Sequence, residues 1–123
     1  MRKLSLLAAS ALLSLSSVGF AGQTIMLAPA VTKKYDLKAH DTTTISNPLF
    51  WSVTVNCSID KTASLTATVL KKSGRINGKK MSKGESMTML VHPGEKFEIK
   101  ADGGAKVSML NHEDYAVKAQ CKT

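Results

Sequence analysis

Two short segments of the sequence combine side chains that are able to bind a soft metal ion. Residues 89–92 read MLVH and residues 109–112 read MLNH, so both share the form Met-Leu-x-His. A thioether sulfur together with an imidazole nitrogen suits Cu(I). One hypothesis is therefore a small periplasmic copper carrier, with metal ligands drawn from Met89, His92, Met109 and His112.

The copper hypothesis depends on how the strands around these segments are arranged. If strands near 86–91, 96–100 and 105–110 form a meander, the first and third run parallel. His92 and His112 then emerge at the same end of the sheet, roughly 10 Å apart. The two methionines, however, also fall on the apolar phase of their segments, where methionine commonly fills gaps in a core. Copper binding is thus kept as the alternative, and no cofactor is expected.

A second candidate site is a run of cations without any acid. The run without Asp or Glu extends from residue 61 to residue 84. Its central cations are Lys71, Lys72, Arg75, Lys79, Lys80 and Lys83. Asn77-Gly78 lies among them, and Asn-Gly is the pair most typical of a two-residue hairpin turn. We expect an exposed hairpin with lysines on both arms. It either binds an anionic polymer or surface, or keeps a sheet edge from pairing with other chains.

Other chemistries find little support in the sequence. The basic run contains no aromatic residue that could stack on bases, so dedicated nucleic-acid binding is not expected. Two of the three histidines, His40 and His112, have acidic neighbours in sequence, but no GxSxG element or comparable nucleophile context accompanies them. We therefore expect the protein not to be an enzyme.

The elements that must position these residues show apolar side chains with a period of two. Short alternating runs of this kind, bounded by turn residues, are typical of half-buried strands. The runs lie at 49–57, 63–69, 87–91, 97–99, 107–109 and 115–121, with two further candidates at 24–28 and 42–46. Seven or eight short strands in about 100 residues predict an all-β fold, a small antiparallel β-sandwich.

The beginning of the chain predicts export. Met1-Arg2-Lys3 precedes an uncharged apolar run, and the small residues Gly19 and Ala21 flank a plausible cleavage site. This pattern is typical of a secretory signal peptide over residues 1–21, and the short charged start is typical of bacteria. Residues 22–123 then form a single domain in the periplasm or outside the cell. No later segment approaches the ~20 apolar residues of a transmembrane helix.

The two cysteines, Cys57 and Cys121, are predicted to form a disulfide, because an exported chain with one cysteine pair normally oxidises it. Trp51 lies on the same phase as Cys57, so we expect it in the core beside the bond. A tryptophan packed on a disulfide resembles the immunoglobulin domains. The order Trp-Cys-Cys differs from theirs, so the resemblance implies an immunoglobulin-like architecture and no function.

Excess positive charge favours an acidic partner. The chain has a formal net charge of +8, and its predicted mature part keeps 15 cations against 9 acids. We therefore expect an exported, non-enzymatic binding module that contacts an anionic surface, an anionic polymer or a protein. Besides the copper carrier, a secreted inhibitor or effector acting on a protein of a host or competitor is the remaining alternative.

Overall fold

The computed structural model describes residues 22–123, and within that range the chain forms eleven β-strands and no helix. The strands are β1 (Thr24–Met26), β2 (Thr32–Leu37), β3 (Thr42–Ser46), β4 (Val53–Ile59), β5 (Ala63–Lys71), β6 (Ser73–Ile76), β7 (Lys79–Ser82), β8 (Ser86–Val91), β9 (Lys96–Ala101), β10 (Lys106–Asn111) and β11 (Val117–Lys122). The all-β prediction is confirmed, with eleven strands in place of seven or eight. Residues 22–123 contain no helix suited to crossing a bilayer. The predicted signal peptide lies outside the described residues.

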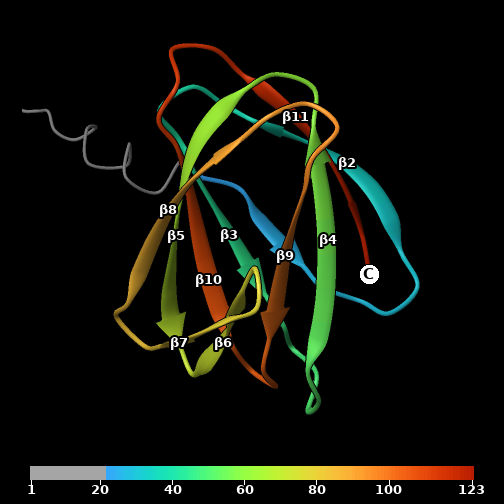
Figure 1. The fold of residues 1–123 in the computed structure, drawn as a ribbon. Helices are drawn as coiled ribbons and strands as arrows, with labels where there is room; N and C mark the ends of the chain where they lie inside the picture. The colour runs from blue at the N-terminus through green and yellow to red at the C-terminus, as the bar shows by residue number, and fades with distance from the viewer. Residues whose placement is uncertain (1–21) are drawn as a thin grey trace, which may run out of the picture.

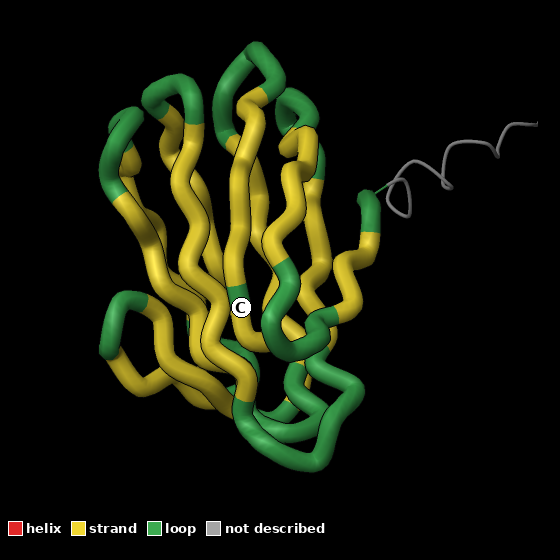
Figure 2. Tube along the Cα trace, turned by 90° about the vertical axis from the view of Figure 1, so that its right-hand side faces the viewer, coloured by secondary structure: helices red, strands yellow, loops and turns green. Residues whose placement is uncertain are grey.

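Two sheets pack face to face in a sandwich-like arrangement (Figures 1 and 2). One has five strands in the order β1-β3-β10-β5-β8, and the other has six in the order β2-β11-β4-β9-β6-β7. All neighbouring strands are antiparallel except the parallel pair β1 and β3. Side chains alternate between the two faces of each strand. The apolar ones meet between the sheets, where Leu65, Val69, Ile99 and Val107 are fully buried.

The chain changes sheets in the middle of what would otherwise be one long strand. β5 belongs to the five-stranded sheet and β6 to the six-stranded sheet, and only Lys72 separates them. Lys72 has a φ of 63°, which is uncommon for a residue other than glycine and redirects the backbone. Gly74 follows, and a Cβ there would lie 2.3 Å from the carbonyl oxygen of Lys100. Glycine is therefore needed where β6 meets β9.

The predicted hairpin is confirmed. β6 and β7 are antiparallel, and Ile76 pairs with Lys79 across the turn. Asn77 and Gly78 have φ values of 50° and 81°, as a type I′ turn requires. Because β6 also pairs with β9, the hairpin forms the edge of the six-stranded sheet instead of projecting alone from the surface.

The meander on which the copper hypothesis depended is not formed. β9 lies in the six-stranded sheet, whereas β8 and β10 lie in the five-stranded sheet on either side of β5. Both are antiparallel to β5, so they still run parallel to each other. His92 and His112 therefore follow strands that end at the same end of the sheet, with β5 between them and not β9.

The disulfide between Cys57 and Cys121 is confirmed. The two residues lie directly opposite each other on the neighbouring strands β4 and β11, with their Cα atoms 4.1 Å apart. Both are buried, so the bond joins the middle of the six-stranded sheet to the last strand of the chain.

The expectation that Trp51 packs beside this bond is wrong. Its side chain is 55% exposed, in the loop that precedes β4. The alternation observed in β4 begins only at Val53, because the segment before it is a loop with its own hydrogen bonds. The immunoglobulin-like pairing of a buried tryptophan with the disulfide is therefore not formed.

Removing the disulfide should lower the stability of the folded protein. The bond closes a loop with a sequence separation of 64, and loops of that length correspond to about 4 kcal/mol in the chain-entropy description. We expect Cys57→Ala/Cys121→Ala to lose about 2–4 kcal/mol of unfolding free energy, as measured by urea denaturation under non-reducing conditions. A loss below about 1 kcal/mol would contradict this account of the bond.

Candidate functional site

The outer face of the six-stranded sheet is dominated by cations. Strand register places on this face Lys34, Arg75, Lys80, Lys96, Lys100, Lys118 and Lys122, together with the acids Asp36 and Glu98. We call this surface the cationic face. Its cations come from five different strands, and only two of them, Arg75 and Lys80, belong to the basic run of the sequence analysis.

Three cations stand side by side across the edge of this face. Arg75 of β6 lies directly opposite Lys100 of β9 on one side and Lys80 of β7 on the other. Neighbouring strands are about 4.8 Å apart, so the three side chains leave the sheet within roughly 10 Å. Like charges in directly opposed positions destabilise a sheet by roughly 0.2–1 kcal/mol per pair. We call Lys80, Arg75 and Lys100 the cation row.

Within residues 22–123, no ion pair neutralises the positive charge of the face. Throughout residues 22–123, the contacts of 4.0 Å or less between basic nitrogens and carboxylate oxygens involve only His40 and His92. No lysine or arginine in that range takes part in such a contact. The cation row and its neighbours are therefore available to an external anion.

Three hollows in this face are each lined by at least two cations. Arg75, Lys80 and Lys100 line one of about 200 Å³, beside Ser73 and Asp102. The other two lie around the middle and the opposite edge of the sheet, at about 550 and 230 Å³. Their polar lining consists of Lys34, Lys96, Lys118 and Lys122 with Thr32, Asn56, Ser58, Asp60, Gln120 and Thr123. Cations, neutral hydrogen-bonding groups and the carboxylates of Asp60 and Asp102 thus line the hollows together.

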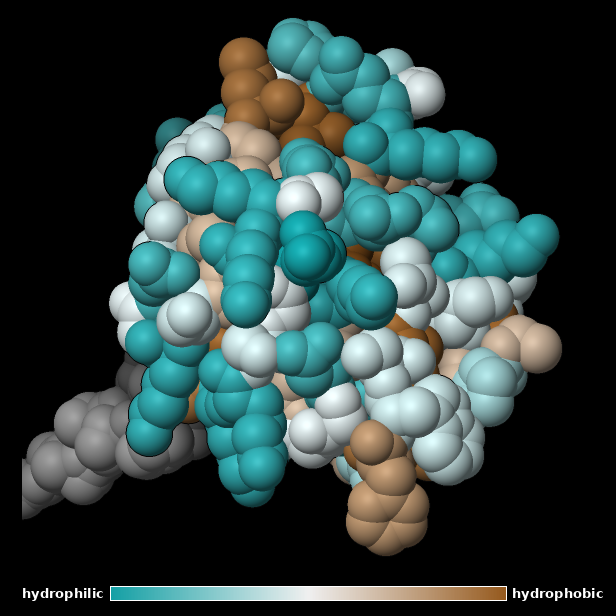
Figure 3. All heavy atoms as spheres, turned by 60° about the horizontal axis from the view of Figure 1, so that its bottom comes forward, coloured by the Kyte–Doolittle hydropathy of each residue, from teal (hydrophilic) through white to brown (hydrophobic). Residues whose placement is uncertain are grey.

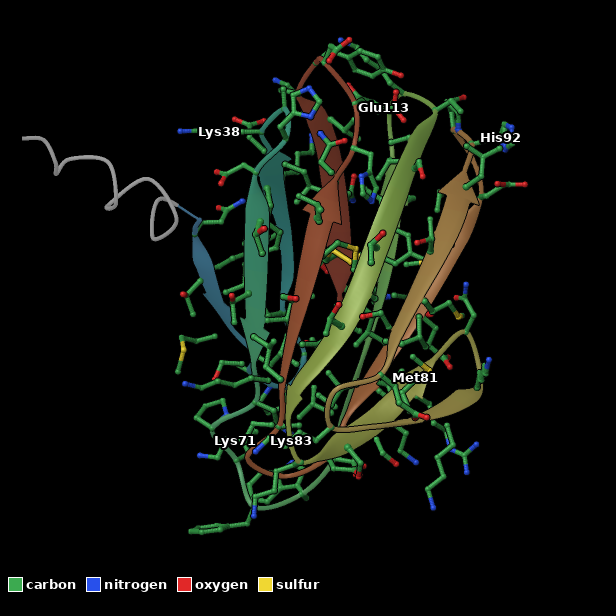
Figure 4. The ribbon with its side chains drawn as sticks, turned by 90° about the vertical axis from the view of Figure 1, so that its left-hand side faces the viewer. Lys38, Lys71, Met81, Lys83, His92 and Glu113 are labelled. Carbon is green, nitrogen blue, oxygen red and sulfur yellow. A yellow bond between two sulfur atoms is a disulfide. The ribbon has the colours of Figure 1, made fainter. Side chains whose placement is uncertain are left out.

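The structure divides the predicted basic hairpin into two groups. Arg75 and Lys80 point out of the cationic face, and Lys79 is exposed at the turn end of β7. Lys71, Lys72 and Lys83 instead lie at the end of the sandwich where β5 stops and β8 starts, as Figure 4 shows for Lys71 and Lys83. The six cations therefore do not form one patch.

The other outer face differs in chemistry. The outward residues of the five-stranded sheet are mainly hydroxyl-bearing, namely Thr42, Thr44, Ser64, Thr66, Thr68, Ser86, Thr88 and Ser108. Some of these hydroxyls bond each other, as between Thr66 and Thr88 at 2.8 Å. Lys106, at the start of β10, lies on this face opposite Lys71 at the end of β5. The cations of the β-strands are thus concentrated on one side of the sandwich.

The predicted copper ligands are not brought together. Met89 and Met109 are buried in the core between the sheets. The His112 ring bonds the hydroxyl of Thr66 at 2.6 Å on the outer face, and the His92 ring lies 3.2 Å from the Glu95 carboxylate. Sulfur and imidazole therefore occupy different sides of the sheet. Within residues 22–123, no cluster of three or more His, Cys, Asp or Glu residues could hold a metal ion.

Acids and histidines gather at the end of the sandwich opposite Lys71 and Lys83 (Figure 4). The loops after β2, β4, β8 and β10 carry His40, His92, His112, Asp41, Asp60, Glu95, Glu113 and Asp114.

Tyr115 also lies at this end of the sandwich, and its hydroxyl donates to the Thr62 carbonyl. Desolvation raises the pKa of the Tyr115 hydroxyl, and the nearby Glu113 carboxylate raises it further. Burial raises the pKa of Tyr35, so both phenols are neutral at pH 7.

Asn47 holds together the loops at the end of the sandwich that carries Lys71, Lys72 and Lys83, which we call the basic end. Sequence reasoning missed this residue. Its side chain is 1% exposed, and its amide nitrogen donates to the carbonyl oxygens of Trp51, Ala101 and Asp102 at 2.8, 3.0 and 3.1 Å. Its side-chain oxygen accepts from the Leu49 amide at 3.0 Å. An asparagine before a proline reads as an ordinary turn residue, so no sequence signal marked it as buried.

Comparison with known proteins found no matching family model, curated protein or solved structure.

Replacing Asn47 should destabilise the protein strongly. Asn47→Ala leaves buried carbonyl groups without a donor, and we expect a loss of about 2 kcal/mol or more in unfolding free energy by urea denaturation. Asn47→Asp should be similarly harmful, because a carboxylate has no hydrogen to donate to those carbonyls. The matched control is Asn56→Ala on the exposed face of β4, which should change stability by no more than about 0.5 kcal/mol. Equal losses at both positions would refute the role of Asn47.

Proposed function

We propose that the protein is an exported, non-enzymatic binding module whose cationic face holds polymers or surfaces with repeated negative charges. The observation that carries this proposal is the cation row, three positive side chains in register on neighbouring strands. Their mutual repulsion opposes folding, and a bound anion would relieve it. A signal-peptide pattern at the start of the chain and an oxidised cysteine pair support the exported location.

The distribution of charge supports a polymer or surface more than a small anion. Every strand of this sheet except β4 contributes a cation to the cationic face. β4 contributes the neutral Thr54, Asn56 and Ser58, which lie between strands that carry charged residues. A single phosphate or carboxylate would contact only one of its three hollows. An extended chain of anionic groups would contact several at once, and each exposed cation would add a small, salt-screened attraction.

The neutral groups of the face indicate which kind of polymer fits. Side-chain amides and hydroxyls such as those of Asn56, Ser58 and Gln120 offer hydrogen bonds to sugar hydroxyls between the charges. Among the described residues, the aromatic rings of Tyr35 and Phe97 in this sheet lie on its inner phase, where no base could stack on them. This composition supports a sulfated, phosphorylated or carboxylated polysaccharide over a single-stranded nucleic acid.

Charge reversal in the cation row should weaken retention on immobilised heparin, a generic polyanion. We expect Arg75→Glu/Lys100→Glu to elute at clearly lower salt than the unmodified protein. The matched control is Lys38→Glu/Lys61→Glu, which changes the net charge equally at the opposite end of the sandwich and should elute at higher salt than the row variant. Equal shifts in both variants would mean that net charge alone governs retention. No shift in the row variant would disprove the proposed site.

A further inference from the structure

Two adjacent aromatic side chains are exposed at the basic end of the sandwich. Phe50 is 98% exposed and Trp51 is 55% exposed, both in the loop between β3 and β4. Leu70, near the end of β5, is 44% exposed at the same end. Figure 3 turns this end toward the viewer and shows an apolar side chain projecting beyond its hydrophilic neighbours. Clustered exposed apolar groups commonly mark interaction sites.

The loop that carries the aromatics is held firmly in place. Besides the hydrogen bonds of Asn47, the Gly104 amide donates to the Leu49 carbonyl at 3.1 Å. A Cβ on Gly103 would lie 2.3 Å from the Phe50 carbonyl oxygen, so the loop rests directly on the turn between β9 and β10. Phe50 and Trp51 are therefore presented by a fixed backbone, and little backbone ordering would accompany their binding.

Four lysines share this end with the aromatics. They are Lys71, Lys72, Lys83 and Lys106. Lys71 and Lys106 are opposite each other on β5 and β10, and the Lys72 stem passes within 3.5 Å of the Cβ position of Gly104, beside the aromatic loop. The two carboxylates here are already engaged: Glu85 accepts from the Ser82 amide, and Asp102 from the hydroxyls of Ser52 and Ser73.

We propose that this end docks on an anionic lipid bilayer. Phe50 and Trp51 enter the interfacial layer, where aromatic side chains are favoured, and Leu70 lies at its edge. The lysines contact lipid phosphates, and each cation near an anionic leaflet raises the affinity by about fivefold. Stable membrane attachment generally needs two signals, an apolar anchor and a basic patch, and this end supplies both.

The rest of the molecule is consistent with this orientation. The loops at the opposite end carry five carboxylates against two lysines, Lys38 and Lys61, so an anionic surface would repel that end and attract the end with Lys71, Lys72, Lys83 and Lys106. The proposal uses different residues from the cationic face and does not depend on it. Polymer binding across the face and bilayer docking at the end can therefore succeed or fail separately.

Trp51 provides the direct test, because it is the only tryptophan in the chain. The purified protein is titrated with vesicles of phosphatidylcholine alone and with vesicles of phosphatidylcholine mixed with phosphatidylglycerol, an anionic lipid that gives the vesicle a negative surface potential. We expect a blue shift of Trp51 emission and protein sedimentation with the anionic vesicles only. Absence of both with anionic vesicles would overturn the proposal, even if the protein is retained on heparin.

Two variants distinguish insertion of Phe50 into the bilayer from nonspecific hydrophobic adsorption. Phe50→Ser should weaken partitioning into anionic vesicles by about tenfold, given the apolar area it removes, and should leave elution from heparin unchanged. The matched control, Leu90→Ser, removes an exposed apolar side chain at the far end of β8 and should leave partitioning unchanged. Circular dichroism verifies that both variants are folded. Unchanged partitioning of Phe50→Ser, or an equal loss in Leu90→Ser, would overturn the proposal.

Discussion

At each end of the sandwich, the geometry of the loops depends on one buried asparagine side chain. Asn47 lies where the chain leaves β3 for β4 of the other sheet, and its amide binds the turn after β9 as well as its own loop. Asn111 has the same role at the opposite end, where its amide nitrogen donates to the carbonyls of Leu37, Lys38 and Tyr115. Buried polar groups are tolerated when they are fully hydrogen-bonded. These two amides fasten the loops that cross between the sheets.

Much of the fold could be predicted because half-buried strands carry a visible alternation. β5 has apolar, buried residues at every second position, and the Asn77-Gly78 turn is an unusually specific signal. The missed strand β2 shows why the rest was harder. Its sequence TKKYDL is mostly exposed at the edge of the sheet, so burial imposes almost no pattern on it. Trp51 was placed wrongly because alternation in sequence was extended into a loop that local hydrogen bonds had already fixed.

Only part of the candidate site could be predicted from the sequence, because its residues come together through the pairing of strands that are distant in the chain. Arg75 and Lys80 are close in sequence, but Lys100 joins them only because β6 crosses into the other sheet and pairs with β9. That crossing depends on the backbone of Lys72 and on the close approach at Gly74. The basic end, with its exposed aromatic side chains, could not be predicted from the sequence for the same reason. Phe50 lies in the loop between β3 and β4, Leu70 in β5 and Lys106 in β10, and only the fold brings them to the same end of the sandwich.

The position of the disulfide has a consequence for how the protein would withstand proteolysis. The hairpin of β6 and β7 is rich in lysine and exposed, as a trypsin-like protease requires, and it lies inside the loop that Cys57 and Cys121 close. A single cut there would leave both fragments covalently joined, with β6 still paired to β9. A cut in the loop of Phe50 and Trp51 falls outside that loop, so only non-covalent contacts would then retain β1, β2 and β3. Backbone cleavage would thus be far more damaging at the aromatic loop than at the most basic hairpin.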